Sequence, residues 1–144
     1  MKLNPKYRAE LTDSQKIKNY VLGGRGVVTL KSDTGVHHTY SFETYDDTPD
    51  NIWIYTLVDD NQWVYVGYYS KKFENFRLTS KSKYPVDSPI VKGIAYIFKM
   101  ILNPEFHDDR MHLLHEGICC RCGRPLTNPA SIELGIGPYC ATQI

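Results

Sequence analysis

All four cysteines of the chain lie in its last thirty residues, which read HEGICCRCGRPLT from His115 to Thr127 and ELGIGPYC from Glu133 to Cys140. Zinc in structural protein sites takes four ligands in a tetrahedron, drawn from Cys thiolates and His nitrogens. The spacing Cys119-x2-Cys122, with Gly123 directly after it, is typical of a zinc knuckle. Two thiolates about one turn apart can hold the metal, while the glycine lets the backbone fold back beneath them.

Two further residues complete the predicted site. Cys140 follows a Gly-Pro pair, a flexible turn with a proline that can begin a short helix, so its thiolate can turn back to the knuckle. His115 stands four residues before Cys119 and is our choice for the fourth ligand. The sequence therefore predicts one structural zinc held by His115, Cys119, Cys122 and Cys140. Because four protein ligands leave no open coordination position, we expect no enzyme activity.

Other interpretations of these residues stay open. Cys120 could replace Cys119 as a ligand, although Cys-x-Cys shortens the bite, and His112 could replace His115. A disulfide is disfavoured because nothing in the chain indicates export. A redox pair is disfavoured because the strand and helix of a thioredoxin-like motif are missing around it.

The tail contains a longer motif, which reads Cys119-x2-Cys122-Gly123-Arg124-x-Leu126-Thr127-x-Pro129-x-Ser131 and then Gly135-Ile136-Gly137-Pro138-x-Cys140. This motif resembles the zinc-binding tail of a family of small uncharacterised proteins that are common in bacteriophages and mobile elements. A looser resemblance upstream extends it over roughly residues 15–144, through Leu22-Gly23-Gly24, Val28-Thr29-Leu30, Thr34-Gly35, Thr39-Tyr40, Tyr65-Val66-Gly67 and Asp87-Ser88-Pro89. The resemblance implies a metal site and a phage or prophage origin, and it implies no established activity. Cys120 is a thiol beyond this pattern.

Composition and charge narrow the classes of function. The chain has 144 residues, of which 42% are hydrophobic and 23% charged, as is typical of a soluble globular protein. No apolar run approaches the ~20 residues of a membrane helix, and the N-terminus does not resemble a signal peptide. We therefore expect a cytoplasmic protein, in the host cell if a phage encodes it. A formal net charge of +1 argues against coating nucleic acid by charge alone.

Residue patterns predict an α+β fold. A short helix is expected from the Thr12 or Asp13 cap to Gly23-Gly24. Alternating patterns predict two hairpins, one formed by residues 27–32 and 37–45 and the other by residues 52–58 and 63–70. They also predict a short strand at residues 76–79. The clearest helix begins at Ser88-Pro89, ends at Asn103-Pro104, and carries an apolar stripe of Ile90, Ile94, Ile97, Phe98 and Ile101.

These elements predict an antiparallel sheet of about four or five strands, covered by one long helix and followed by a zinc knuckle. We expect two domains: residues 1–104 form the α+β domain with its two hairpins, and residues 105–144 form the zinc-binding knuckle. The second hairpin carries rings on one face, with Trp53 and Tyr55 on one strand and Trp63, Tyr65 and Tyr69 on the other. Whether these rings are exposed or buried beneath a second layer stays open at this point.

The leading functional hypothesis is a binding module that contacts nucleic acid. Stacking a base on an aromatic ring is worth roughly 1–3 kcal/mol, so a few exposed rings matter despite the low net charge. The expected contacts are Trp53 and Tyr65 with the basic residues Lys71, Lys72, Arg77, Lys81, Lys83 and Arg124. The alternative is a phage counter-defence protein that inhibits a host protein or sequesters a nucleotide signal. It predicts a closed aromatic pocket in place of an open stripe.

Overall fold

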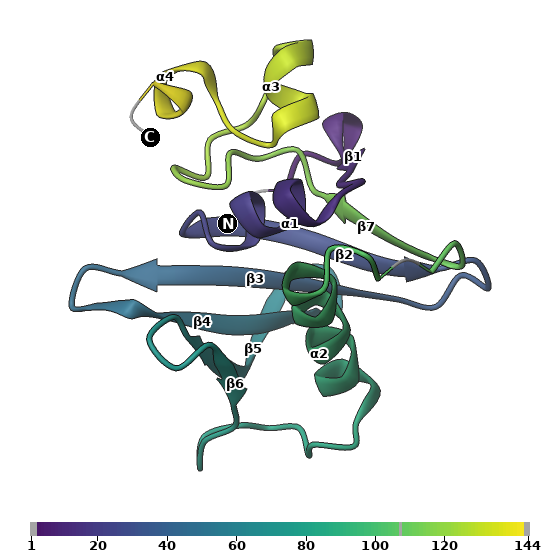
Figure 1. Ribbon diagram of the computed structural model, residues 1–144, viewed down its shortest axis with the longest axis vertical. Helices are drawn as coiled ribbons and strands as arrows, with labels where there is room; N and C mark the ends of the chain where they lie inside the picture. The colour runs from purple at the N-terminus through teal and green to yellow at the C-terminus, as the bar shows by residue number, and fades with distance from the viewer. Residues whose placement is uncertain (1–2, 107, 143–144) are drawn as a thin grey trace.

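A seven-stranded antiparallel sheet runs through the computed structural model, which describes residues 3–106 and 108–142 (Figure 1). The strands lie in the order β1-β7-β2-β3-β4-β5-β6. In chain order the elements are the 3-10 helix Pro5–Tyr7, β1 Ala9–Glu10, α1 Ser14–Val21, β2 Arg25–Ser32, β3 His37–Tyr45, β4 Thr48–Val58, β5 Gln62–Ser70, β6 Asn75–Arg77, α2 Pro89–Leu102, β7 Met111–His115, α3 Pro129–Leu134 and α4 Pro138–Ala141.

The α+β class predicted from the sequence is confirmed, whereas the expected count of four or five strands is wrong. The two additional strands, β1 and β7, lie at one edge of the sheet. Strand β7 pairs with β2 on one side and with β1 on the other. Its residue His115 lies opposite Val28 of β2 and opposite Ala9 of β1. These partners lie far apart in the sequence, and β1 has only two residues, so no local alternation marks either strand.

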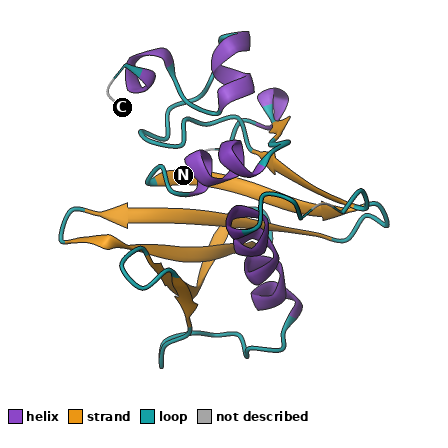
Figure 2. Ribbon diagram, viewed as in Figure 1, coloured by secondary structure: helices purple, strands orange, loops and turns teal. Residues whose placement is uncertain are grey.

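Helices α1 and α2 both cover the same face of the sheet (Figure 2). Each begins at a side-chain cap, since Asp13 accepts from the Lys16 N–H and Ser88 accepts from the Val91 N–H. The expected single covering helix is therefore corrected to a pair. Helix α1 takes part because Ile17, Tyr20 and Val21 are buried in the same core as α2. Among the described residues, no helix is long and apolar enough to cross a membrane.

The core beneath α2 is closely packed. Ile94 and Ile97 are fully buried, and Phe98 stacks on Tyr69 of β5 with 4.2 Å between ring centroids. Tyr40 of β3 donates from its hydroxyl to the Ile90 carbonyl. A β-carbon at Gly93 would collide with that hydroxyl, so the glycine lets the helix lie directly on the strand.

A bulge changes which side chains of β5 share a face. Ile54 of β4 lies opposite Gly67, and Tyr55 lies opposite Tyr65, so Val66 is the extra residue. Beyond the bulge the alternation therefore shifts by one position. Tyr69 turns into the core, although the sequence pattern grouped it with Tyr65, and Tyr68 takes its place on the other face.

Strand β7 lies beyond residue 104 and is nevertheless part of the central sheet, between β1 and β2. The remainder of the tail, with α3 and α4, lies beyond the edge of the sheet that β1 and β7 form (Figure 1). The expected division into an α+β domain of residues 1–104 and a knuckle domain of residues 105–144 stays a prediction.

The buried face of α2 generates a direct test. Ile94→Asp places a carboxylate in the apolar core, which costs several kcal/mol against a typical total stability of about 5–15 kcal/mol, so we expect the protein to unfold. Lys92→Asp, two positions away on the exposed side of α2, is expected to leave the melting temperature nearly unchanged. Thermal melts followed by circular dichroism compare the two variants. Equal melting temperatures would contradict this assignment of the buried face.

Candidate metal centre and aromatic sheet face

A tight backbone loop holds the first two cysteines of the knuckle. The N–H of Cys119 donates to the Arg124 carbonyl at 2.8 Å, and the N–H of Gly123 donates back to the Cys119 carbonyl at 2.9 Å. Gly123 adopts a left-handed conformation with φ of 76°, which a glycine reaches without steric cost. The turn therefore presents the side chains of Cys119 and Cys122 on the same side, as the knuckle spacing predicts.

Helices α3 and α4 bring the third cysteine back to this loop. Asn128 caps α3 by accepting from the Ala130 N–H, and Gly135 ends the helix with φ of 73°. A β-carbon at Gly135 would also lie only 2.5 Å from the ring of Tyr20. Helix α4 then begins at Pro138 and carries Cys140, which packs with Cys119 and Leu126 in a small apolar cluster of the tail.

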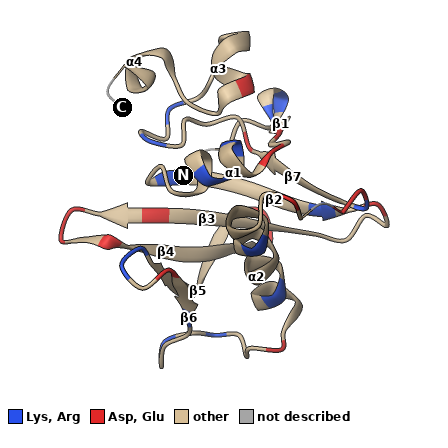
Figure 3. Cartoon of the chain, in the orientation of Figure 1, with Lys and Arg blue, Asp and Glu red and all other residues tan. Residues whose placement is uncertain are grey.

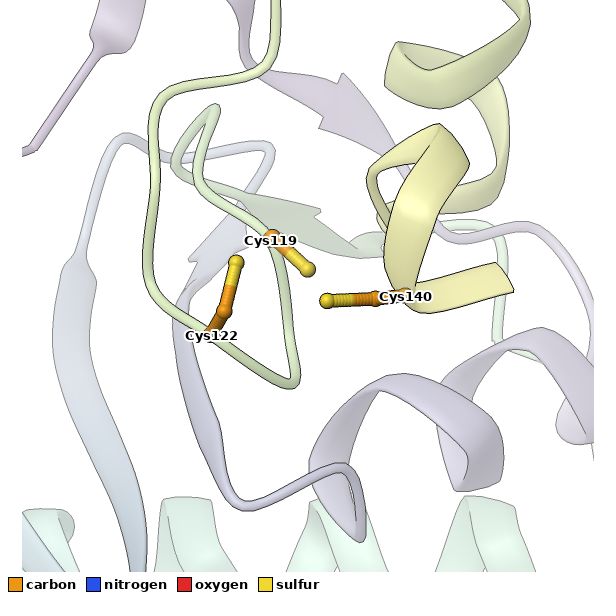
Figure 4. Close-up of side chains that lie close together, drawn as sticks. All are labelled: Cys119, Cys122 and Cys140. Atoms are coloured by element: carbon orange, nitrogen blue, oxygen red, sulfur yellow. The ribbon is translucent and has the colours of Figure 1, made fainter. Parts of the chain in front are cut away.

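The sulfur atoms of Cys119, Cys122 and Cys140 all lie within 4.8 Å of one another and point toward a common centre (Figure 4). The backbone N–H groups of Arg121 and Gly137 donate to the Cys119 sulfur at 3.4 and 3.3 Å. Burial raises the pKa of the Cys119 thiol, but backbone N–H donors outweigh it, so the net shift is downward. Three thiols in this arrangement could hold a metal ion.

His115 does not join this group in the part of the chain that the structure describes. Its Nε2–H donates to the Ile132 carbonyl at 2.5 Å, and its Nδ1 accepts from the Gly117 N–H at 3.1 Å. Its ring stacks on Tyr20 with 5.3 Å between centroids. Burial lowers the pKa of His115, and the hydrogen bond that Nδ1 accepts requires that nitrogen to carry no proton. With both nitrogens engaged, His115 fastens α3 to the sheet, and its predicted role as a metal ligand stays a prediction.

The alternative ligands lie elsewhere. Cys120 is buried in the main core against Gly23, and burial raises the pKa of its thiol to about 12. His112 is on the face of β7 opposite to that of His115. There its Nε2 lies 2.8 Å from Asp33 and its Nδ1 lies 3.4 Å from Glu10. The three-thiol group thus contains Cys119 and excludes both Cys120 and His112.

A buried carboxylate that sequence reasoning missed ties the two ends of the chain together. Glu116 is 1% exposed, lies 2.8 Å from the Arg8 guanidinium, and accepts from the Thr29 hydroxyl at 2.5 Å. Its own carbonyl accepts from the Asn4 N–H. A buried charge is stable only when it is paired and hydrogen-bonded, and Glu116 meets both conditions. No sequence signal separated it from an ordinary surface glutamate.

The face of the sheet opposite α1 and α2 carries five half-buried rings, which we call the aromatic face: Trp53, Tyr55, Trp63, Tyr65 and Tyr68. Trp53 lies 6.2 Å from Tyr65 and 5.2 Å from Tyr68, measured between ring centroids. Tyr55 meets Tyr65 edge to face at 5.8 Å. Neither α1 nor α2 covers these rings, which are partly open to solvent.

The predicted basic contacts divide into two places. Arg77 of β6 is paired with Tyr68 and so extends the aromatic face, and both Arg77 and Lys72 lie over the ring of Phe73. Lys71, Lys81 and Lys83 belong to the same part of the chain, in the loops on either side of β6 (Figure 3). Arg124 belongs to the knuckle, beyond the opposite edge of the sheet. The structure therefore does not bring Arg124 together with the other five.

Comparison with known proteins concerns the tail. Residues 110–144 match the model of a family described as a family of unknown function (DUF6011). No curated protein and no solved structure matches the chain. The match supports the similarity of the cysteine-rich tail to an uncharacterised domain family.

The three-thiol group predicts how metal binding responds to substitution. Cys122→Ser is expected to abolish binding of the single metal ion, since it removes one thiolate, and its exposed side chain contributes little packing. Structural zinc contributes on the order of 10 kcal/mol in small sites, so residues 117–142 should lose protection from hydrogen exchange while β2–β5 keep theirs. Metal content by mass spectrometry and hydrogen exchange measure both effects.

Cys120→Ala is the matched control and should retain a full complement of metal. X-ray absorption at the metal edge tests the fourth ligand, because a bound imidazole gives characteristic outer-shell scattering. The three-thiol group predicts metal–sulfur scattering at about 2.3 Å, and an added imidazole signal would identify His115 as the fourth ligand. A variant lacking Cys122 that still purifies with stoichiometric metal would contradict the assignment of the three-thiol group.

Proposed function

We propose that the protein is a small zinc-stabilised accessory binding protein of phage type, which contacts single-stranded nucleic acid through its aromatic face. In this proposal the metal is structural, the protein is not an enzyme, and it works in the cytoplasm of the host cell. The observation that carries the proposal is the row of neighbouring rings on the face of the sheet opposite α1 and α2, flanked by basic loops.

Zinc is the metal that best fits the donors of the tail. Thiolates are soft ligands that favour zinc over calcium or magnesium, and three of them meet at one point. The N–H donors at Cys119 favour its ionised, metal-binding form. A structural role follows from the position of the group, since its cysteines join the knuckle loop to α4.

The aromatic face suits unpaired bases. Every base has a π-face, so rings spaced along a strand bind single strands with little dependence on sequence. Trp53, Tyr65 and Tyr68 form a chain of contacts that ends beside Arg77. Each ring is half-buried, which holds it in a fixed orientation and lowers the entropy lost on binding.

The basic residues supply the phosphate contacts. The loop after β6 starts beside the aromatic face, where the Thr79 hydroxyl donates to the Tyr65 hydroxyl at 3.4 Å. Lys81 and Lys83 follow in that loop and are exposed. A nucleic-acid strand stacked on the rings would run past these two lysines. Their local positive charge compensates for the protein's net charge of only +1.

Nucleic-acid binding is tested with labelled single-stranded oligonucleotides at about 50 mM salt, where phosphate contacts are strong. Tyr65→Leu is expected to weaken binding roughly 5- to 150-fold with little change in the salt dependence, as the loss of one stacked base predicts. Lys81→Glu with Lys83→Glu is expected to weaken binding to all sequences and to reduce the log–log salt slope by about 0.7 per lost contact. Fluorescence anisotropy measures both.

Two control variants match these changes. Tyr139→Ala removes a ring that is 76% exposed but lies in α4, and Lys18→Glu with Lys92→Glu reverses two charges on the helix-covered side. Both should bind as the unmodified protein does. If no oligonucleotide binds at low salt, the proposal fails, and the counter-defence alternative is adopted, with a host protein or nucleotide signal as the partner.

A further inference from the structure

A shallow hollow of about 250 Å³ opens on the sheet next to the aromatic face. We call it the Glu43 hollow, and its lining consists of Ser41, Glu43, Tyr45, Tyr55 and Trp63. The hydroxyls of Tyr45 and Tyr55 are 3.4 Å apart, which joins the β3 end of the hollow to β4. The volume is just below the ~300–1,000 Å³ of sites for drug-sized ligands, so it suits one planar ring system.

The carboxylate of Glu43 is the unusual group in this hollow. Its side chain is only 12% exposed, and no hydrogen bond reaches it from the residues that the structure describes. Among the described residues it forms an ion pair with Arg25, with 4.0 Å between Nε and Oε2, beyond the ~2.7–3.2 Å of a hydrogen bond. Burial raises the pKa of Glu43, while Arg25 opposes the shift. A carboxylate that is largely shielded from water and accepts no hydrogen bond from the described residues gains from a ligand that brings donors.

We propose that the Glu43 hollow is a subsite for a guanine base, which stacks on the lining rings and donates two N–H groups to the Glu43 carboxylate. This inference rests on the proposed function and adds a base preference to it. The N1–H and the N2 amine lie side by side on the Watson–Crick edge of guanine. They match the two oxygens of a carboxylate, and such two-point bonds to an ionised acceptor are among the stronger ones. The Ser41 hydroxyl can donate to the neighbouring O6.

Other bases fit this acceptor less well. Adenine and cytosine each place one amine beside a ring nitrogen that is itself an acceptor. Uracil flanks its single N–H with two carbonyl oxygens, which repel a carboxylate. Each good two-point contact discriminates against the wrong base by an amount that corresponds to roughly 5- to 150-fold in affinity. Guanine is therefore the base that the hollow selects.

The test uses nucleoside monophosphates, which probe the hollow without a long phosphate chain. Guanosine monophosphate is expected to quench the fluorescence of Trp63 and to bind at least about tenfold tighter than adenosine monophosphate. Inosine monophosphate, which lacks the N2 amine, should fall between the two. Equal affinities for the guanine and adenine nucleotides would overturn the inference.

Substitutions locate the effect at the carboxylate. Glu43→Gln is expected to remove the preference for guanine while weak stacking persists, because the amide presents only one acceptor. Glu105→Gln changes an exposed glutamate outside the hollow and should keep the full preference. Trp63→Leu should weaken binding of all three nucleotides equally. Thermal melts confirm that each variant is folded. A preference that survives Glu43→Gln would place the selection elsewhere and overturn the inference.

An oligothymidine titration separates this inference from the proposed function. If oligothymidine binds but guanine is not preferred, the guanine subsite is wrong and single-strand binding stands. If guanosine monophosphate binds with its preference while no oligonucleotide binds, the subsite stands and nucleic acid is not the partner. If tetramethylammonium displaces the nucleotide at equal concentration, the hollow is a cation site, and the guanine assignment fails.

Discussion

The pairing of β7 between β1 and β2 is the interaction on which the rest of the structure depends. Five residues from the C-terminal half, Met111–His115, extend the sheet that the N-terminal half begins. The pairing fixes the direction in which the tail leaves the sheet and brings Glu116 against Arg8 and Thr29. A long loop must close before these contacts form, and the ladder hydrogen bonds together with the half-buried Arg8–Glu116 ion pair offset that entropic cost.

The junction behind β7 then positions the cysteine-rich tail. Tyr20 donates from its hydroxyl to the Ile118 carbonyl at 2.9 Å and stacks on His115, whose Nε2–H bonds to α3. Since every polar group in this contact has a partner, the junction resists rearrangement. It holds α3 and α4 so that Cys140 meets the knuckle loop. His115, which the spacing predicts as a metal ligand, has both ring nitrogens engaged in this junction, and its role as a ligand stays a prediction.

Helices α1 and α2 cover the same face of the sheet, and this asymmetry shapes the proposed function. The two longest helices, α1 and α2, pack on one face, where Ile54, Phe42 and Val66 are fully buried. The opposite face keeps its rings partly exposed and places Glu43 in a hollow beside them. Aromatic side chains tolerate this position because they bury much of their surface against one another while leaving an edge or a face for a ligand.

The sequence by itself determined the elements that follow from local chemistry: the two hairpins, the capped helix Pro89–Leu102 and the Cys119–Cys122 knuckle with Cys140 nearby. Alternation, caps and glycine turns act within a few residues, so they can be recognised in the sequence. Only the tertiary structure decided the positions of β1 and β7, the bulge at Val66 and the engagement of both His115 nitrogens. The strand positions and the His115 contacts depend on partners that are distant in the chain, and the bulge depends on a register that a single extra residue shifts. Distant partners and register shifts leave no local pattern in the sequence.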